Sequence, residues 1–295
     1  MQTILAKTIL TKNKYPDAWF GNDYNMNLYR GCHHGCIYCD SRSDCYQNYD
    51  FDNVKLKENV IEILSKELRS KRFKGVVGIG AMSDSYNRFE ESQQITRQAL
   101  TLIRDYHFGV SLETKSDLVV RDIDLFLDIQ KCNDVIIKMS ITCADDYLSS
   151  LIEPNVSVSS KRFAAIKKIS DAGIFTGVLL HPLLPFITDN DENIKEIVRL
   201  SYEAGAKFVN CFFGVSLRDG QREYFYSQLD KKFPDLKEKY IKRYGQKYLC
   251  KSKNISHLRY IFEKECKKYG LLYKMEDIIN AYKTHCISYE QISLF

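Results

Sequence analysis

Short apolar strands alternate with amphipathic helical segments as far as Phe213, and this alternation constrains the fold more than any other feature. Five buried strands are predicted where β-branched or other apolar residues run together between turn residues. They are 75–80, 110–114, 135–141, 175–180 and 208–213. Between them apolar residues recur at helical spacing, as at Val60, Leu64 and Leu68. The chain therefore reads as a series of strand–helix units.

This order predicts a parallel sheet, because only a crossover helix returns the chain in the same direction. Counting the segment before Cys32 as the first strand gives six βα units, fewer than the eight of a TIM barrel. We expect an α/β fold, a partial (β/α)6 barrel over residues 24–216, after an N-terminal segment over residues 1–23. Chemistry in such barrels gathers at the carboxyl ends of the strands, and Cys32 follows such an end.

Three cysteines, Cys32, Cys36 and Cys39, form a C-x3-C-x2-C motif in this loop. Three thiolates on one loop can bind three corners of a [4Fe–4S] cube and leave one iron open to a small chelating molecule. Zinc is an alternative, but a structural zinc site usually pairs two half-sites, and no second C-x2-C occurs in the sequence. Buried free thiols are the other alternative, although cysteines crowded beside two His and two Gly are a poor core pattern.

With this motif the chain resembles the radical SAM superfamily. The resemblance implies that S-adenosylmethionine (SAM) chelates the open iron, that the reduced cluster passes an electron to the sulfonium, and that a 5′-deoxyadenosyl radical then abstracts hydrogen from a substrate. A six-unit partial barrel is also the fold that this family implies. Tyr38, directly before the third cysteine, is similar to a family aromatic that packs near the adenine.

Further motifs resemble the spore photoproduct lyase-like branch, whose members are often described as DNA repair photolyase-like proteins. They follow in order along the chain: Gly80-Ala81-Met82-Ser83-Asp84-Ser85-Tyr86, Glu113-Thr114-Lys115-Ser116, Met139-Ser140-Ile141, Ile152-Glu153-Pro154 and Pro182-Leu183-Leu184-Pro185. The resemblance implies that Ser83, Asp84, Lys115 and Ser140 contact the amino acid end or the ribose of SAM. Taken alone, Ser83-Asp84 also suits a helix N-cap, and Lys115 suits a solvated loop. Glu153 suits a structural ion pair with Arg162.

One departure from this branch bears on the reaction. Spore photoproduct lyases place a cysteine just before the Ser-Asp pair, where it returns a hydrogen atom to the product radical. Ala81 and Met82 occupy that place here, which argues against true spore photoproduct cleavage. Cys45, close behind the cluster loop, and Cys143, after the fourth strand, are the candidate hydrogen donors, and each also suits an ordinary buried thiol.

Beyond the barrel, residues 217–295 are expected to form a basic helical extension. Residues 231–274 contain 14 Lys or Arg against 4 Asp or Glu, so the positive charge of the chain gathers here. Such a stretch can neutralise nucleic-acid phosphates or can be a solvated helix face. Tyr240, Tyr244 and Tyr248 lie among these cations, where they suit either base stacking or the buried face of a helix.

The C-terminal residues Gln291-Ile292-Ser293-Leu294-Phe295 look like the short peptide by which bacterial repair proteins bind the DNA sliding clamp. An extended peptide of this kind would bury Leu294 and Phe295 in a groove while Gln291 forms hydrogen bonds. An apolar terminus that docks on its own barrel is the alternative. The sequence does not identify the electron donor.

Composition agrees with an enzyme of the cytoplasm. The sequence has 10 cysteines and no secretory signal, so we expect a reducing compartment, and no apolar run is long enough to span a membrane. The sequence thus predicts a radical SAM enzyme with one [4Fe–4S] cluster that acts as a lyase-like enzyme on damaged or modified nucleic acid. A radical SAM enzyme for a small molecule or peptide is one alternative, and a zinc-bound nucleic-acid-binding module without catalysis is another.

Overall fold

The computed structural model describes residues 2–285. Its central sheet has seven strands in the order β10-β9-β8-β7-β6-β3-β2. The bounds are β2 Leu10–Lys12, β3 Tyr24–Met26, β6 Val76–Ile79, β7 Gly109–Thr114, β8 Val135–Ser140, β9 Thr176–Leu180 and β10 Phe208–Cys211. The six strands from β3 to β10 are parallel, and β2 adds an antiparallel strand beside β3. The predicted partial (β/α)6 barrel is confirmed.

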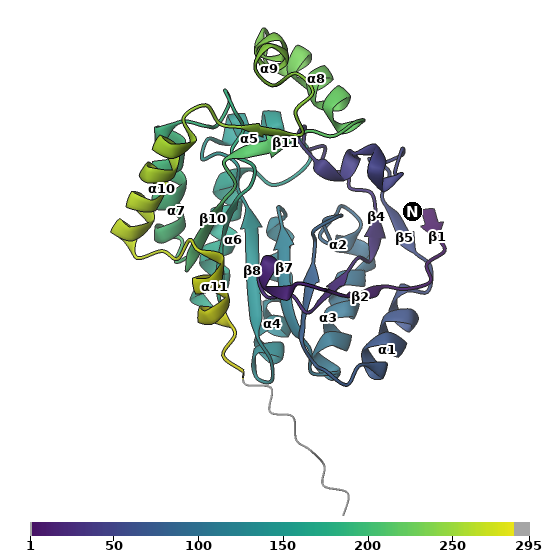
Figure 1. Cartoon of the computed structure of the whole chain (residues 1–295). Helices are drawn as coiled ribbons and strands as arrows, with labels where there is room; N and C mark the ends of the chain where they lie inside the picture. Colours follow the sequence, from purple (N-terminus) through teal and green to yellow (C-terminus); the bar gives the residue numbers. More distant parts are fainter. Residues whose placement is uncertain (1, 286–295) are drawn as a thin grey trace, which may run out of the picture.

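Helices cover the outer side of this sheet, as Figure 1 shows. They are α1 Val60–Ser70, α2 Glu90–Gln93, α3 Ile95–Asp105, α4 Ile123–Gln130, α6 Ser159–Asp171 and α7 Asp191–Glu203, whereas α5 Asp146–Ile152 lies at the end of the barrel toward which the strands point. In α1 the buried residues are Val60, Leu64 and Leu68, one helical face that packs into the core. Every residue of β8 is buried, as expected of a β-branched strand in a parallel sheet covered on both faces.

A second, three-stranded sheet stands beside the barrel, in the order β1-β5-β4. Its strands are β1 Gln2–Ile4, β4 Tyr29–Arg30 and β5 Lys55–Lys57. The cysteine motif lies in the segment between β4 and β5. This sheet therefore holds both ends of that segment close to the first barrel strands.

The C-terminal part of the described chain contains helices and one pair of strands. Its elements are β11 Gly214–Ser216, α8 Gln221–Lys232, α9 Leu236–Tyr244, β12 Leu249–Lys251, α10 Ile255–Tyr269 and α11 Met275–Tyr282. The antiparallel pair β11 and β12 was not expected. α10 packs against α7, and a bridge between Phe208 and Leu272 extends the sheet beyond β10. In Figure 1, α8 and α9 lie at the end of the barrel toward which the strand arrows point.

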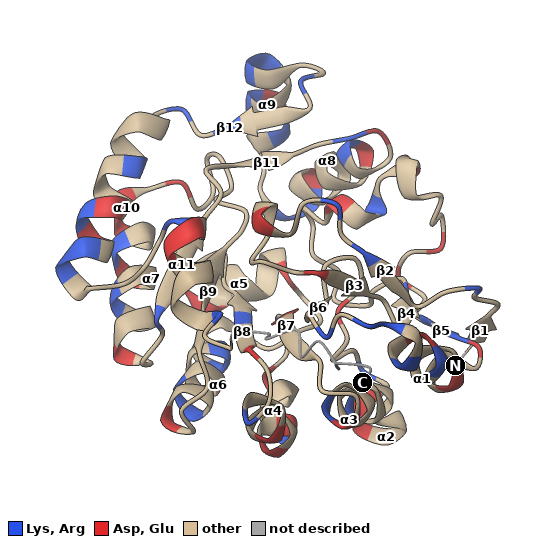
Figure 2. Cartoon of the chain, turned by 60° about the horizontal axis from the view of Figure 1, so that its bottom comes forward, with Lys and Arg blue, Asp and Glu red and all other residues tan. Residues whose placement is uncertain are grey.

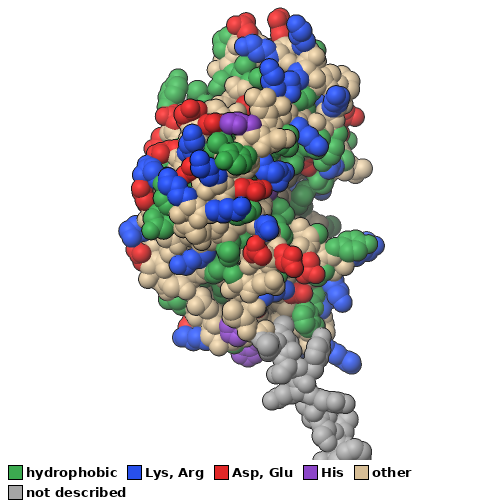
Figure 3. Space-filling model, turned by 60° about the vertical axis from the view of Figure 1, so that its left-hand side comes forward, with side chains coloured by type: hydrophobic (Ala, Val, Ile, Leu, Met, Phe, Trp, Pro, Cys, Tyr) green, Lys and Arg blue, Asp and Glu red, His purple; other side chains and the backbone are tan. Residues whose placement is uncertain are grey.

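The tyrosines of this region divide between core and surface. Tyr240 and Tyr244 on α9 are buried, whereas Tyr248, beyond the end of α9, is 51% exposed. Tyr240 and Tyr244 thus lie on the buried face of the helix, where they cannot stack on bases. Figure 2 shows basic residues on α9, and Figure 3 shows Lys and Arg interspersed with Asp and Glu on the side of the molecule that it views.

Two further expectations concern the C-terminal peptide and membrane-spanning segments. The peptide with Gln291, Leu294 and Phe295 lies outside the described residues. Within residues 2–285, no helix combines the length and the apolar character that crossing a membrane requires.

Candidate active site

One cavity collects most of the side chains that the sequence motifs single out. We call it the cysteine cavity. It is lined by Cys32, His34, Cys36, Cys39, Ser41, Gly80, Ala81, Met82, Ser83, Asp84, Glu113, Thr114, Lys115 and Ser140. Residues at or just after the carboxyl ends of β6, β7 and β8 meet here because parallel strands bring these ends to one rim. Three thiols, one ammonium and several hydroxyls thus face a common space.

The cysteine loop is fixed by backbone hydrogen bonds to two other segments. The Cys32 amide donates to the Phe51 carbonyl at 2.8 Å, and the Ile37 amide donates to the Ile152 carbonyl at 3.0 Å. Gly31 has φ +84°, and a Cβ there would lie 2.6 Å from the Phe51 carbonyl oxygen. Glycine is therefore needed for the chain to enter the loop at this angle.

The side chains of Cys32 and Cys36 are buried, and Cys39 is partly buried. Burial raises the pKa of the Cys32 thiol to about 12 and that of the Cys36 thiol well above its ordinary value. Metal ligation requires the thiolate, so these side chains become thiolates only when a cationic centre is bound. The donor set fits such a centre, since all three sulfurs border one cavity.

The arrangement of the three thiols bears on the kind of metal centre they could hold. Between residues 2 and 285, no three Cys, His, Asp or Glu side chains converge closely enough to hold one metal ion. The cysteines of a [4Fe–4S] site bind separate irons, so they must surround a cavity rather than meet at a point. The three cysteines line one cavity in this way.

Asp84 ties the ends of β6 and β7 together. Its carboxylate accepts hydrogen bonds from the Thr114 hydroxyl at 2.7 Å and from the Lys115 amide at 2.8 Å. It also accepts from the Tyr86 amide at 2.9 Å and lies 3.5 Å from Nδ1 of His34, whose pKa is lowered by burial. Protein donors thus occupy both carboxylate oxygens, so Asp84 organises the rim.

Three other predicted residues keep polar groups toward the cavity. The Ser83 hydroxyl donates to the Gly31 carbonyl and so connects this wall to the cysteine loop. Ser140 is buried at the end of β8 and lines the cavity. Among the ion pairs of the described chain, none includes Lys115. Burial alone would lower the pKa of Lys115, but the Glu153 carboxylate and, once ionised, the Cys36 thiolate raise it above its ordinary value.

Tyr38 lies behind this cavity rather than in its lining. Its hydroxyl donates to Glu153 and lies 3.1 Å from the Thr142 hydroxyl, while Lys115 Nζ is 5.8 Å from the centre of its ring. Glu153 pairs with the buried Arg162 at 2.6 Å, which confirms the predicted ion pair. The Tyr38 ring thus lies beside the Lys115 ammonium, and its hydroxyl ties the cysteine loop to Glu153 in the loop between α5 and α6.

Neither candidate hydrogen donor lines the cysteine cavity. Cys45 is exposed in a neighbouring cavity, where its Sγ lies 3.2 Å from Arg218. Cys143 is buried in the apolar cluster that includes Cys36 and Tyr38, with its Sγ 3.4 Å from the Asp145 carbonyl oxygen. Both thiols therefore stand apart from the space that the three loop cysteines enclose.

Sequence reasoning gave no role to several residues of the cavity. His34, Ser41, Glu113 and Thr114 belong to its lining. His34 lies within the cysteine motif and Glu113 is the first residue of the Glu-Thr-Lys-Ser motif, so both motifs could have indicated that these residues line the cavity. Glu113 also lies 3.9 Å from Nζ of the buried Lys138, a partner on the neighbouring strand that no local pattern indicates.

Comparison with known proteins agrees with this fold. Residues 26–200 match the family described as the radical SAM superfamily. An uncharacterized protein of Mycobacterium tuberculosis (strain ATCC 25618 / H37Rv) is 30% identical over 249 residues, covering 82% of this chain and 72% of that protein. An uncharacterized protein of Methanocaldococcus jannaschii is 32% identical over 196 residues, covering 65% of this chain and 71% of that protein.

Solved structures show the same fold at low identity. Spore photoproduct lyase complexed with dinucleoside spore photoproduct has a TM-score of 0.65 and 16% identity, covering 90% of this chain and 78% of that chain. A variant of the same lyase with bound AdoMet and the dinucleoside has a TM-score of 0.63 and 17% identity, covering 84% of this chain and 74% of that chain. Because the family match spans more than half of its residues, the chain belongs to the radical SAM superfamily.

Proposed function

We propose that Cys32, Cys36 and Cys39 bind a [4Fe–4S] cluster, that SAM binds beside it in the cysteine cavity, and that the enzyme acts on damaged or modified nucleic acid. The observation that carries the proposal is the joint lining of one cavity by three thiols and the Lys115 ammonium. A thiolate trio leaves one iron open, and a nearby ammonium suits a ligand that carries a carboxylate.

The protein's own residues would bind and orient the cofactor. Lys115 would pair with the SAM carboxylate, while Ser140 and Ser83 would hydrogen-bond its amino acid end or ribose. Asp84 would hold the Lys115 backbone, through the 2.8 Å hydrogen bond from its amide, and Tyr38 would support the lysine. When bound and reduced, a cluster of this kind supplies the electron that cleaves the SAM sulfonium to give a radical.

A nucleic-acid substrate and lyase-like chemistry are supported by the fold shared with spore photoproduct lyase, which has been solved with a dinucleoside photoproduct. The exposed cations Lys242, Arg243 and Lys247 support the same substrate class. Ala81 and Met82 border the cavity where that lyase carries its cysteine, so we do not propose spore photoproduct itself as the substrate. A hydrogen atom would have to return from Cys45, from Cys143 or from the cofactor. Of the two thiols, the exposed Cys45 is the more accessible to a large substrate.

Anaerobic reconstitution with iron and sulfide tests the cofactor assignment. We expect a brown protein that cleaves SAM to 5′-deoxyadenosine when reduced, and loss of both properties in the triple variant Cys32→Ala, Cys36→Ala, Cys39→Ala. Cys132→Ala is the matched control, because Cys132 is an exposed thiol outside the cavity. A triple variant that still binds iron and cleaves SAM would contradict the assignment, and a colourless protein that retains zinc would favour the non-catalytic module.

Deuterium transfer tests the substrate class. Reduced enzyme and SAM are incubated with deuterated DNA or RNA, and 5′-deoxyadenosine is examined for deuterium by mass spectrometry. Label from the nucleic acid supports the proposal. Label that comes only from a cellular small-molecule or peptide fraction would support the alternative substrate class instead.

The clamp peptide adds a partner to the proposal. Gln291, Leu294 and Phe295 would bind the DNA sliding clamp, which would bring the enzyme to replicating DNA. Pull-down with purified clamp measures this, with Leu294→Ala, Phe295→Ala as the variant that should lose binding. Equal capture of the wild type and the variant would remove the clamp from the list of partners.

A further inference from the structure

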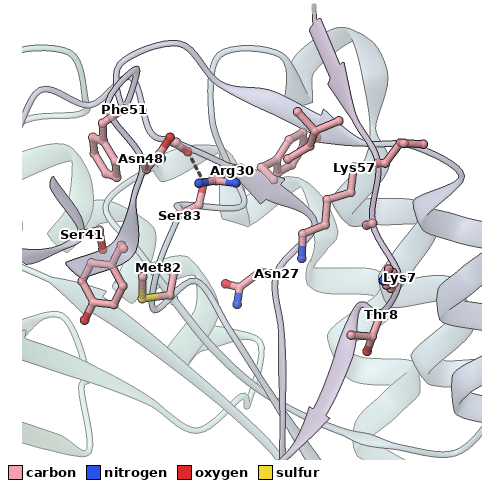
Figure 4. Close-up of a pocket in the computed structure, with 16 residues that line it drawn as sticks. Lys7, Thr8, Asn27, Arg30, Ser41, Asn48, Phe51, Lys57, Met82 and Ser83 are labelled. Carbon is pink, nitrogen blue, oxygen red and sulfur yellow. Dashed lines mark hydrogen bonds between the residues drawn. The ribbon is translucent and has the colours of Figure 1, made fainter. Parts of the chain in front are cut away.

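A second cavity opens directly beside the cysteine cavity, and we call it the Lys57 cavity. It has a volume of about 340 Å³, within the range of small-ligand sites. Ser41, Met82 and Ser83 line both cavities, so the two spaces share a wall. Figure 4 shows Lys57 reaching from β5 toward Asn27, with Met82 and Ser41 on one side and Lys7 and Thr8 on the other.

The lining of the Lys57 cavity has one sign of charge. Lys7, Arg30 and Lys57 contribute cations, and no Asp or Glu lines the space. Within the described chain none of the three takes part in an ion pair. Burial lowers the pKa of Lys57, and the Arg30 charge lowers it further against the opposite effect of Glu67. The Glu67 carboxylate itself accepts hydrogen bonds from the amides of Ile9 and Leu10.

The Arg30 charge disfavours the charged form of the half-buried Lys57, and an anion in the cavity would offset that repulsion. Polar donors accompany them, because Asn27, Asn48 and Thr8 are also part of the lining. Lys, Arg, Asn and Thr side chains are the groups that usually contact nucleic-acid phosphates. A phosphate can accept several such hydrogen bonds at once.

We propose that the Lys57 cavity binds a phosphodiester of the substrate strand, next to the nucleotide whose base or sugar lies at the mouth of the cysteine cavity. This inference rests on the proposed nucleic-acid substrate and adds where that substrate is held. Because Ser41, Met82 and Ser83 line both cavities, a strand that contacts one cavity has only a short distance to cross to reach the other. The exposed side chain of Leu5, at 88%, lies at the rim, where a sugar could contact it.

The test measures binding of a fluorescent single-stranded 12-mer to the reconstituted enzyme by anisotropy at several salt concentrations. Lys57→Gln should weaken binding about tenfold and reduce the slope of log K against log salt by about 0.7, the value for one phosphate contact on a single strand. Lys57→Arg keeps the charge and should bind nearly as the wild type does. Arg30→Gln is a second variant at an exposed cation of the same lining, and circular dichroism checks that losing its 2.6 Å hydrogen bond to the Gln47 carbonyl leaves the fold intact.

Lys168→Gln is the control, an exposed lysine of α6 that lies in neither cavity. Circular dichroism confirms that each variant is folded. If the wild type binds the 12-mer and both Lys57→Gln and Arg30→Gln bind it with unchanged affinity and slope, this inference is overturned while the proposed function stands. If the wild type binds no oligonucleotide, the nucleic-acid substrate itself is overturned, and this inference with it.

Discussion

Lys115 is the residue on which the proposed SAM site depends most, because it brings the only ammonium to the described lining of the cysteine cavity. Replacing it with Met removes a charge-assisted hydrogen bond, which typically contributes about 1.5–3 kcal/mol. We therefore predict a SAM affinity about 10- to 100-fold lower for Lys115→Met than for the wild type, measured by equilibrium dialysis on the reconstituted protein. Unchanged affinity would show that the carboxylate of SAM is held elsewhere.

Lys138 is a buried lysine in the barrel interior, and it makes a second prediction at this scale. Its Nζ lies 2.8 Å from the Ser111 hydroxyl, and burial lowers its pKa from 10.5 to about 8. The unfolded chain therefore binds more protons than the native chain at pH between these values, so this group opposes folding most below pH 8 and not above pH 10.5. Lys138→Met should raise the free energy of unfolding at pH 7.

Denaturant titration at pH 7 and near pH 10.5 measures this effect. The gain of Lys138→Met over the wild type should shrink as the pH rises through that interval. A variant that is less stable than the wild type at pH 7 would contradict the prediction. A gain in stability together with a loss of SAM cleavage would mean that the enzyme needs the positive charge of Lys138 for its activity.

At the scale of single residues, the sequence predicted which side chains line the cavity better than it predicted which residues they contact. The three cysteines and Lys115 follow from spacing and motif, and they line one cavity. The roles of Asp84 could not be read in this way, since its acceptor sites are filled by Thr114 and Lys115 from the next strand. Such bonds depend on which strands are neighbours, and a local pattern does not contain that information.

Among elements, the loop between α5 and α6 holds the cysteine loop in place through buried charge. Burial alone would raise the pKa of Glu153, but Arg162 and Lys115 lower it below its ordinary value of 4.5. Its stabilising contribution is therefore fully present above pH 4.5 and is lost as the pH falls through the lower native value. Breaking a buried pair leaves an uncompensated charge, so Glu153→Gln should cost about 3–5 kcal/mol.

Denaturant titration at pH 7 measures the cost of Glu153→Gln. The difference from the wild type should diminish in acid, where Glu153 of the wild type is protonated as well. A loss below about 1 kcal/mol at pH 7 would show that the pair is dispensable for the loop, as exposed pairs usually are.

The turn after β6 offers an internally controlled test of backbone geometry. Gly80 has φ +102°, and a Cβ there would lie 2.0 Å from the Glu113 carbonyl oxygen. Gly173 also has positive φ, +85°, but a Cβ there would meet nothing within 4 Å. Gly80→Ala should therefore destabilise by about 3 kcal/mol or more and Gly173→Ala by about 1 kcal/mol, as measured by urea titration. Equal losses of unfolding free energy in the two variants would mean that the turn after β6 shifts to accommodate the added Cβ without strain.

The strands of the barrel were predictable because each is a buried apolar run bounded by turn residues. β11 and β12 were not, because each has three residues, and Lys251 at the end of β12 is exposed. Their pairing brings together residues 214–216 and 249–251, which lie far apart in the chain. The same limit applies to Tyr240 and Tyr244, since a stripe at helical spacing does not reveal whether a partner covers it.

On the scale of the whole molecule, two separate groups of cations lie where a nucleic-acid strand could contact both. One is the Lys57 cavity, and the other is the region of α9, whose Lys242 and Arg243 are exposed together with Lys247 beyond its end. The side chain of Gln221 on α8 donates to the Tyr38 carbonyl at 2.8 Å, which places the helical extension against the cysteine loop. A strand at the mouth of the cysteine cavity thus has cations available on more than one side.

Neutralising Lys242, Arg243 and Lys247 together should lower the slope of log K against log salt by about 2 for a single-stranded oligonucleotide, if each cation contacts one phosphate. Combination with Lys57→Gln should lower it by about 0.7 more, because distant contacts to one strand release counterions independently. Anisotropy titrations of the wild type, the triple variant and the quadruple variant measure both steps. A triple variant with an unchanged slope would leave the extension as a solvated helix face, and the strand would then follow the Lys57 cavity alone.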